Sequence, residues 1–433
     1  MKKYYSKETT QALENFPLST HIVYIELIHA VTKVKKATAE ANYKDGGIDK
    51  KIKNAITDAC DEILTGKFDD QFQTAAIQGG AGTSINMNVN EVIAGIASEK
   101  SGIRVHPNDH INKSQSTNDA NPTSLKILMY GMLKSVVKSG DLLVASFDKK
   151  AKEFKKIMKL GRTHIQDAVP ITLGDEFDSY KEIIKRGVLR IKESEKYLFD
   201  LNIGGTAVGN GINATDIFRK SVIEEIQKIT KEKRFKLAKS LMSQTSSQTD
   251  ILFVADTIKT LFVDLSKIAG DLRLLSSGPN GGLGEIRLKP LQAGSSIMPG
   301  KVNPVIPEYM NQVYYYVSGK RMSIEHAAHT SNLELGIMFP VIADSIISIM
   351  RIATDSLETF AVKCIDSIEA NEKNCRENLE KSTAFATLLT PKFGYDMVSK
   401  VVKESLKSGK SIREIFIEKK ILTNEEFDNM TRL

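Results

Sequence analysis

The sequence contains no tryptophan, and its 433 residues include only three cysteines and 11 prolines. Cys60, Cys364 and Cys375 show no CxxC spacing, and so small and odd a set argues against a disulfide framework and for a reducing compartment. Aromatic residues make up 7% of the chain, whereas Lys and Glu are common. This composition favours helix over sheet.

Long apolar runs and segregated charge are also missing. No stretch of 18 apolar residues occurs, and no apolar run follows the two lysines of the MKKYYSKETTQ start, so we expect neither a membrane span nor a signal peptide. The net charge is +7, but basic and acidic residues are interleaved, unlike the basic stripe of a nucleic-acid-binding protein. No group of His, Asp and Glu has metal-ligand spacing. We expect a cytoplasmic protein with no metal, cofactor, membrane or nucleic-acid partner.

Apolar side chains recur every three or four residues in several long segments, as on one face of a helix. The clearest stripe is formed by Ile258, Leu261, Phe262, Leu265, Ile268, Leu272 and Leu275. Similar patterns predict helices over residues 123–145, 175–200, 215–230 and 340–365. Pro122 stands at a plausible start for the first of these helices. Successive helices of this length predict a long bundle.

The C-terminal segment carries two short helix-start signals. Ser411 with Glu414 and Thr423 with Glu426 have the spacing of capping boxes. They predict a small helical domain at this end of the chain.

Small polar residues concentrate in four segments that should form loops. These are GGAGTSINMNVNE (79–91), HPNDHINKSQSTNDANPT (106–123), GRTHIQDAVP (161–170) and QAGSSIMPGKVNP (292–304). Alone, each has an ordinary interpretation, such as a helix N-cap at Thr83 and Ser84 or a structural histidine at His164. Together, their hydroxyl, amide, imidazole and ammonium groups suit the binding of carboxylates, and the Gly-Ser loop suits stabilisation of an oxyanion. The residues alone therefore indicate an enzyme for a small carboxylic acid.

These motifs, in this order, resemble those of the aspartase/fumarase superfamily, from about residue 4 to residue 430. GSSIMPGKVNP looks like its signature loop. The resemblance implies a mostly α, three-domain subunit with domains at 1–118, 119–373 and 374–433. It also implies a long central helical bundle, a homotetramer with a twenty-helix core, and active sites that are each built from three subunits.

The resemblance further implies a mechanism and residue roles. Superfamily members remove a proton beside a carboxylate, form an aci-carboxylate carbanion and expel an amine or hydroxyl group. The implied catalytic residues are Ser295 as the base, His164, and Glu308 as the partner of His164. The implied substrate-binding residues are Thr83, Ser84, Ser116, Thr117, Asn118, Thr163, Ser296, Lys301 and Asn303. Gly294 and Gly300 are candidate hinges for closure of the loop.

Within the superfamily, GGAGTS, QSTNDA and KVNPVIPE are closer to the aspartase branch. That likeness implies elimination of ammonia from L-aspartate, a small anionic amino acid, to give fumarate. Departures from the family pattern at Gln11, Gly336 and Lys392 mark possible specificity positions, and Asn210 and Thr390 depart as well. They leave open another amino acid, or a betaine of the ergothioneine type that loses trimethylamine, and after these the fumarase reaction. A non-catalytic protein is a further alternative, but the intact set of Ser295, Lys301 and Asn303 speaks against it.

Overall fold

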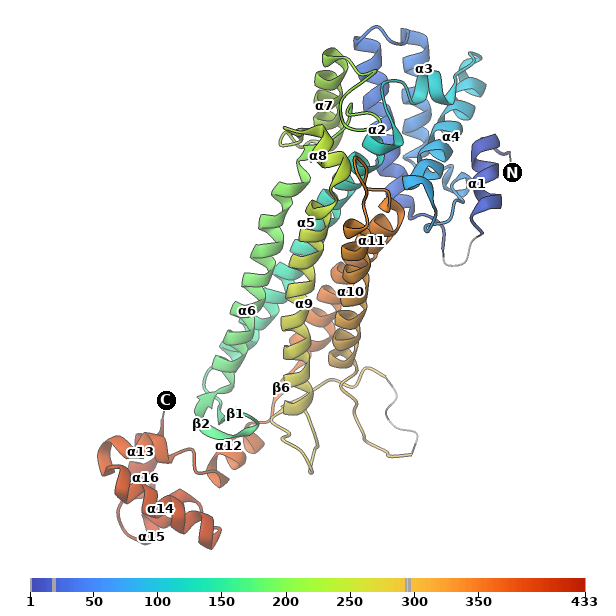
Figure 1. Cartoon of the computed structure of the whole chain (residues 1–433). Coiled ribbons are helices and arrows are strands. Elements are labelled where there is room, and N and C mark those ends of the chain that lie inside the picture. Colours follow the sequence, from blue (N-terminus) through green and yellow to red (C-terminus); the bar gives the residue numbers. More distant parts are fainter. Residues whose placement is uncertain (1, 18–20, 293, 295–296, 433) are drawn as a thin grey trace. The chain divides into compact units, whose positions relative to one another are not determined.

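Helices dominate the computed structural model, which describes residues 2–17, 21–292, 294 and 297–432 (Figure 1). The α-helices are α1 (Lys7–Asn15), α2 (Ile25–Lys44), α3 (Lys50–Ile63), α4 (Thr83–Ser101), α5 (Thr117–Glu153), α6 (Leu173–Ser194), α7 (Asp216–Thr230), α8 (Leu241–Ser246), α9 (Thr249–Leu275), α10 (Val305–His329), α11 (Phe339–Thr359), α12 (Glu372–Lys381), α13 (Ala386–Phe393), α14 (Tyr395–Ser408), α15 (Ile412–Glu418) and α16 (Asn424–Thr431). The strands are β1 (Met158–Thr163), β2 (Gln166–Thr172), β3 (Asp200–Leu201), β4 (Lys236–Leu237), β5 (Ile286–Arg287) and β6 (Glu369–Ala370). The predicted mostly helical fold is confirmed.

The chain divides into two compact units, each assembled from three stretches of sequence. Unit 1 comprises Met1–Val137, Leu189–Thr260 and Tyr315–Thr354. Unit 2 comprises Lys138–Val188, Leu261–Tyr314 and Asp355–Leu433. The five long helices α5, α6, α9, α10 and α11 contribute residues to both units.

In unit 1, ion pairs join neighbouring long helices. Arg321 of α10 lies 2.5 Å from Asp256 of α9, and Lys320 of α10 lies 2.7 Å from Asp344 of α11. Asp344 is buried, so its pairing with Lys320 offsets the cost of removing the carboxylate from water.

In unit 2, aromatic side chains fill the space between the long helices. Phe147 of α5 packs against Phe177 and Tyr180 of α6, with ring centroids 5.9 and 6.0 Å away. The short helices α12 to α16 bury a hydrophobic cluster of their own, and Leu160 of β1 belongs to that cluster. The hairpin β1–β2 is therefore packed against the C-terminal helices.

The predicted helices form, but the start of α5 differs from the prediction. All seven residues of the 258–275 stripe are buried in α9. The helix α5 begins at Thr117, five residues before Pro122, which lies inside it. Proline has no N–H to donate to the carbonyl of Asn118, four residues earlier. The side-chain amide of Asn202 donates to that carbonyl instead, at 3.1 Å, so the helix can begin ahead of the proline.

Both capping boxes are present, with reciprocal hydrogen bonds at Ser411 and Glu414 and at Thr423 and Glu426. All three cysteines are buried and free. Among the described helices, none combines the length and the apolar character that crossing a bilayer requires.

A buried carboxylate of α4 anchors the N-terminal helix α1. Glu91 accepts hydrogen bonds from the backbone N–H groups of Ser6, Glu8 and Thr9 and from the hydroxyls of Ser6 and Thr9, at 2.6–3.1 Å. Burial raises the pKa of Glu91, but these donors outweigh the burial and leave the pKa below its ordinary value. Glu91 therefore satisfies the N–H groups that the first turn of α1 leaves unpaired.

Replacement of Glu91 with Gln should loosen α1 without unfolding α4. The amide has one acceptor oxygen in place of two, and we expect a loss of about 2 kcal/mol locally. Amide hydrogen exchange across residues 7–15 should then accelerate about 30-fold. The depressed pKa contributes stability above about pH 4.5 that is lost as the pH falls through the lower folded value, so the two proteins should converge in acid.

Glu99 offers a matched control, because it also lies on α4 and pairs with the N-terminal segment through Lys2, at 2.7 Å. Both side chains are exposed, and the change of Glu99 to Gln should leave exchange in α1 nearly unaltered. Equal effects of the two changes would contradict the assigned role of Glu91.

Candidate active site

Two helix N-termini that carry predicted site residues meet in unit 1. Thr83 and Ser84 open α4, and Thr117 opens α5 directly after Ser116. The side chain of Asn121 donates to the carbonyl of Gly82 at 3.0 Å, which ties the start of one helix to the first turns of the other. Helix N-termini present free N–H groups and partial positive charge, so this place suits the binding of an anion such as a carboxylate.

Gly82 makes this approach possible. Its φ is 82°, a left-handed conformation that other residues rarely adopt. A Cβ at this position would lie 2.7 Å from Nδ2 of Asn121 and 3.0 Å from the ring of Phe339. The glycine of the GAGTS motif therefore has a packing role as well as a conformational one.

Asp119 joins the STND segment (116–119) to the Gly-rich segment 203–211 through buried hydrogen bonds. Its carboxylate is fully buried and accepts backbone hydrogen bonds from Ser116 at 2.9 Å, Gly204 at 3.0 Å and Thr206 at 2.8 Å. Burial raises the pKa of Asp119 to about 6, although these donors act in the opposite direction. The Gly-rich segment 203–211 is thereby fixed beside the start of α5, where Asn118 donates from its side chain to the carbonyl of Ala207 at 2.7 Å.

A buried polar cluster lies beneath the same helix starts. The ammonium group of Lys35 donates to Asn112 and Gln115 at 3.0 and 2.9 Å, and burial lowers the pKa of Lys35 to about 7. Asn86 of α4 donates to Asn112 at 3.1 Å and to the hydroxyl of Thr117 at 3.2 Å. The hydroxyl of Thr117 is therefore held in a fixed position.

The GRTH motif forms a hairpin in unit 2. Thr163 pairs with Gln166, so His164 and Ile165 alone make the turn between β1 and β2. Both have positive φ, 56° and 61°, as in the type I′ turns that normally use Asn-Gly. His164 and Ile165 are exposed at the tip, and a β-branched residue in this conformation is strained.

The Gly-Ser loop at 292–304 precedes α10 in the chain. Ser295 and Ser296 lie outside the described residues. Where the loop is described, residues 297–304 form neither helix nor strand before α10 begins, as the sequence predicts. A Cβ on Gly294 would lie 2.1 Å from the carbonyl oxygen of Lys301, so the two backbone segments approach at a distance that only glycine allows.

The predicted site residues divide between the two units. Unit 1 contains Thr83, Ser84, Ser116, Thr117 and Asn118, together with Gln11 and Gly336. Unit 2 contains Thr163, His164, Lys301, Asn303, Glu308 and Lys392. Among the described contacts within one chain, no hydrogen bond or ion pair joins His164 to Glu308. Their pairing stays a prediction for the assembled protein.

The positions that depart from the family pattern have different surroundings. Gly336 donates its N–H to the carbonyl of Thr245 at 3.0 Å, and a Cβ there would meet Nε2 of Gln248 at 2.5 Å. A larger residue at 336 thus requires Gln248 to move.

Lys392 lies in unit 2, with its ammonium group 3.5 Å from the sulfur of Met430, and Gln11 is exposed on α1.

Three residues that organise the candidate site are not among those predicted from the sequence. Asp119 and Asn202 act on the start of α5, and Glu285 acts on the hairpin that carries His164. Asp119 belongs to the STND motif and lies in the first turn of α5, where acidic residues are favoured. Its position in the motif could therefore have identified it. Within the described parts of the chain, no group of three or more His, Cys, Asp or Glu side chains is placed to hold a metal ion.

Comparisons with known proteins agree with this picture. A family model described as lyase matches residues 1–319, and one described as fumarase C C-terminus matches residues 385–433. An aspartate ammonia-lyase of Helicobacter pylori is 45% identical, over 99% of this chain and 93% of its own length. That of Bacillus subtilis is 41% identical, over 98% of this chain and 90% of its own length. A solved fumarate lyase:delta crystallin of Brucella melitensis, bound to cobalt, has a TM-score of 0.96 at 40% identity and covers 100% of this chain and 95% of that one.

The strained hairpin turn gives a testable prediction. Glycine adopts positive φ freely, so replacement of Ile165 with Gly should stabilise the hairpin by about 1 kcal/mol and raise the thermal unfolding midpoint. Differential scanning calorimetry checks the midpoint. The change of Val169 to Gly, in β2 of the same hairpin, should lower it, because a strand interior gains nothing from glycine. A lower midpoint for the Ile165 variant would contradict the strain.

Proposed function

The chain belongs to the aspartase/fumarase superfamily of lyases, and we propose that its separate motifs combine into one active site that eliminates ammonia from L-aspartate. The likeness to aspartate ammonia-lyases along nearly the whole chain is the observation that carries this function. The protein is an ammonia-lyase that interconverts L-aspartate with fumarate and ammonia.

The paired helix N-termini of unit 1 are the proposed site for the β-carboxylate of the substrate. Thr83, Ser84, Ser116 and Thr117 would donate hydroxyl hydrogen bonds, and Ser296 would join them. Removal of the neighbouring proton gives this carboxylate a second negative charge. Donors already fixed by Asn86 and Asp119 need little rearrangement when that charge develops, so they stabilise the transition state more than the ground state.

The remaining motifs have complementary proposed roles. Ser295 would remove the proton, which requires a dry site and nearby N–H groups because a serine hydroxyl is weakly acidic. Lys301 and Asn303 would bind the α-carboxylate. Asn118, Thr163 and His164 would surround the departing amine, with Glu308 fixing the imidazole tautomer. Gly294 and Gly300 would serve as hinges when the loop closes.

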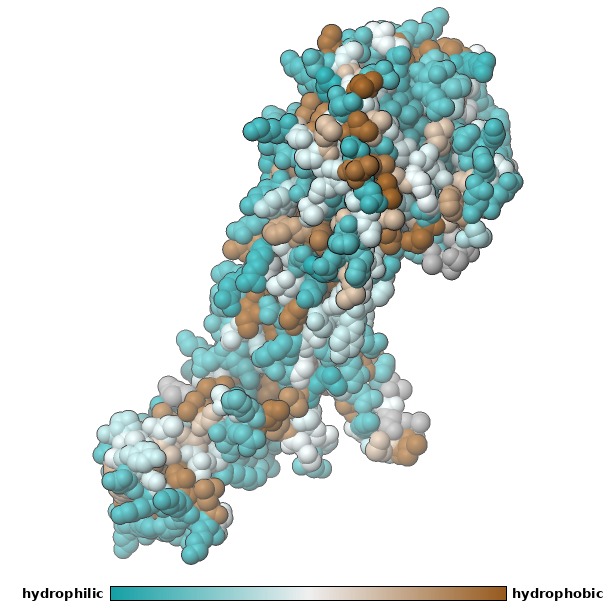
Figure 2. Space-filling view, in the orientation of Figure 1, coloured by the Kyte–Doolittle hydropathy of each residue, from teal (hydrophilic) through white to brown (hydrophobic). Residues whose placement is uncertain are grey.

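We also propose that the protein is a cytoplasmic homotetramer with shared active sites and with the domain division 1–118, 119–373 and 374–433. Exposed apolar residues on α9 and α10 support the assembly: Phe253, Val263, Leu274, Tyr315, Tyr316 and Met322. Figure 2 shows hydrophobic groups interrupting the hydrophilic surface along the long helices. Such helix surfaces gain stability when copies of the chain cover them.

The reaction is tested with purified protein and L-aspartate, by the absorbance of fumarate at 240 nm. Ser295→Ala should lower the rate by about 10²–10⁴-fold, because the proposed base is removed. Ser408→Ala, at the exposed end of α14, is the control and should match the wild type. Full activity of the Ser295 variant would refute the mechanism. Turnover of malate, methylaspartate, argininosuccinate or ergothioneine in place of aspartate would refute the substrate.

The shared site is tested by mixing two defective subunits. Thr117→Val and Ser295→Ala should each lose at least about 10²-fold in rate, because each removes a group that acts in the transition state. Co-expressed as mixed tetramers, they should recover about a quarter of the native sites if the two residues come from different subunits. The control is a homotetramer of the double variant Thr117→Val, Ser295→Ala, in which no site can be native. Absence of recovery in the mixture would place both residues of a site on one subunit.

A further inference from the structure

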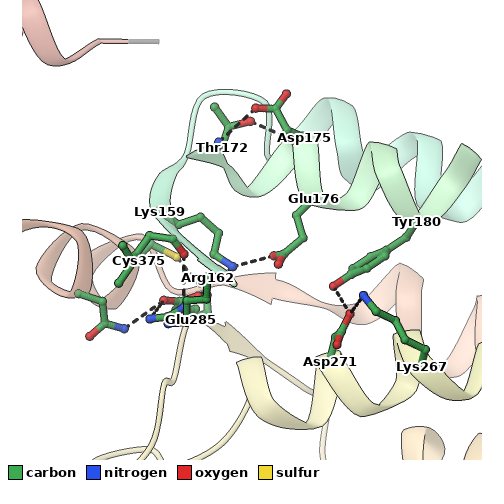
Figure 3. Close-up of polar contacts among 12 residues, drawn as sticks. Lys159, Arg162, Thr172, Asp175, Glu176, Tyr180, Lys267, Asp271, Glu285 and Cys375 are labelled. Atoms are coloured by element: carbon green, nitrogen blue, oxygen red, sulfur yellow. Dashed lines mark hydrogen bonds and ion pairs between the residues drawn. The ribbon is translucent and has the colours of Figure 1, made fainter. Parts of the chain in front are cut away.

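A buried ion cluster lies beside the hairpin β1–β2 in unit 2 (Figure 3). The carboxylate of Glu285 is fully buried and lies 3.0 Å from the ammonium group of Lys159 and 2.9 Å from the guanidinium group of Arg162. Lys159 also lies 2.7 Å from Glu176. We call these four residues the Glu285 cluster, and their two positive and two negative charges balance.

Both cations of the cluster come from β1, the strand that leads into His164. Residues three apart on a regular strand point to opposite faces, but the register of the hairpin shifts between Leu160 and Arg162. Gly161 lies at the shift, where a Cβ would be 2.7 Å from the carbonyl oxygen of Val169. The irregular strand lets both cations reach one carboxylate, while Leu160 packs into the cluster of C-terminal helices.

The turn itself has little to hold it. His164 and Ile165 are exposed and have positive φ without being glycine or asparagine. A strained turn persists only when its surroundings fix the strands on either side. Arg162 is two residues before His164 and directly before Thr163, so the ion pair with Glu285 acts at the base of the turn.

Glu285 is in turn held firmly in its own segment. Its N–H donates to the carbonyl of Leu275 at 2.8 Å, and its carbonyl accepts from Asn371 at 2.9 Å. Asn378 of α12 donates to its carboxylate at 3.2 Å. Burial raises the pKa of Glu285, but Arg162 and Lys159 outweigh the burial and leave the pKa below its usual value, so the carboxylate is charged at neutral pH.

We propose that Glu285 is a positioning residue for the lyase reaction, which holds Thr163 and His164 at the hairpin turn through Lys159 and Arg162. The proposal rests on the proposed function, in which these two residues surround the departing amine. Glu285 does not contact substrate. It acts by keeping the strained turn in one conformation, so that binding energy is not needed to order it during the reaction.

Glu285→Gln removes the charge and keeps the shape of the side chain. We expect kcat to fall about 10- to 100-fold, because a small displacement of His164 disturbs departure of the amine. KM should change less than about threefold, since the carboxylate-binding residues of unit 1 are untouched. Amide exchange across residues 158–172 should accelerate.

Arg162→Met is the second variant, because Arg162 is partly exposed and its loss leaves Lys159 and Glu176 paired. It should give the same combination of lower kcat and nearly constant KM. Asp271→Asn is the control: Asp271 binds Tyr180 at 2.9 Å and pairs with Lys267 in the same unit, without contact to β1 (Figure 3). Its kcat and hairpin exchange should equal those of the wild type.

Folded Glu285→Gln and Arg162→Met proteins with wild-type kcat and unchanged hairpin exchange would overturn the proposal. If Glu285→Gln fails to fold, Arg162→Met decides. The exchange measurement needs no substrate, so absence of aspartate turnover in the wild type would refute the proposed function while hairpin exchange still decides the role of Glu285.

Discussion

Buried N–H and ammonium groups need acceptors. Three buried carboxylates, those of Glu91, Asp119 and Glu285, accept from donors at the start of α1, in the segments around α5 and in the hairpin β1–β2. Glu91 accepts the donors at the start of α1, Asp119 joins the STND segment to the Gly-rich segment 203–211, and Glu285 binds the hairpin β1–β2. Each carboxylate accepts at least one hydrogen bond or ion pair from a segment that is distant in the sequence. The helices form a rigid frame, but the loops that carry the predicted chemistry take their shape from these contacts. Polar satisfaction, more than apolar packing, therefore determines where the site residues lie.

The sequence predicts the long helices because burial of an apolar stripe leaves a periodic pattern, as in α9. It predicts capping boxes because their partners are three residues apart. It fails where a partner is distant in the chain. The sequence predicts that α5 starts at Pro122, because proline is favoured in the first turn of a helix. No local signal shows that the side chain of Asn202, 84 residues from Asn118, donates to the carbonyl that Pro122 leaves unpaired. A long separation in the sequence likewise hides the pairing of Glu285 with Arg162, which lie 123 residues apart. For Thr163 and His164 the motif identifies the residues, whereas the strained turn that presents them emerges only from the backbone.

The proposed carboxylate-binding residues and the positions that depart from the family pattern have different kinds of surroundings. The helix starts that hold Thr83, Ser84, Ser116 and Thr117 suit any carboxylate, since N–H groups and hydroxyls recognise charge and oxygen geometry without regard to the rest of the ligand. Gly336 affects how closely the side chain of Gln248 can approach the backbone. With no side chain it lets Gln248 approach closely, so a polar amide fills space that a larger residue would occupy. A departure at such a position changes the shape of its surroundings and leaves the proposed carboxylate-binding groups unaltered. The motifs therefore indicate the class of reaction, whereas the departing positions are the proposed places to look for specificity.

The hairpin turn illustrates how stability and chemistry oppose each other at one point in the chain. A turn of Asn-Gly would be relaxed at positive φ, but it would have no imidazole to offer. The His164–Ile165 turn keeps the imidazole at a cost in backbone strain. In our proposal the Glu285 cluster offsets that cost by fixing β1, the strand that leads into the turn. A charge-balanced set of ion pairs around the buried carboxylate of Glu285 suits this task, because its geometry is directional and each cation that is lost leaves that carboxylate with one partner fewer. An apolar contact of the same size would tolerate rotation and sliding of the strand. Ion pairs at the base of an exposed, strained turn are therefore an arrangement suited to hold the proposed site residue His164 in one orientation.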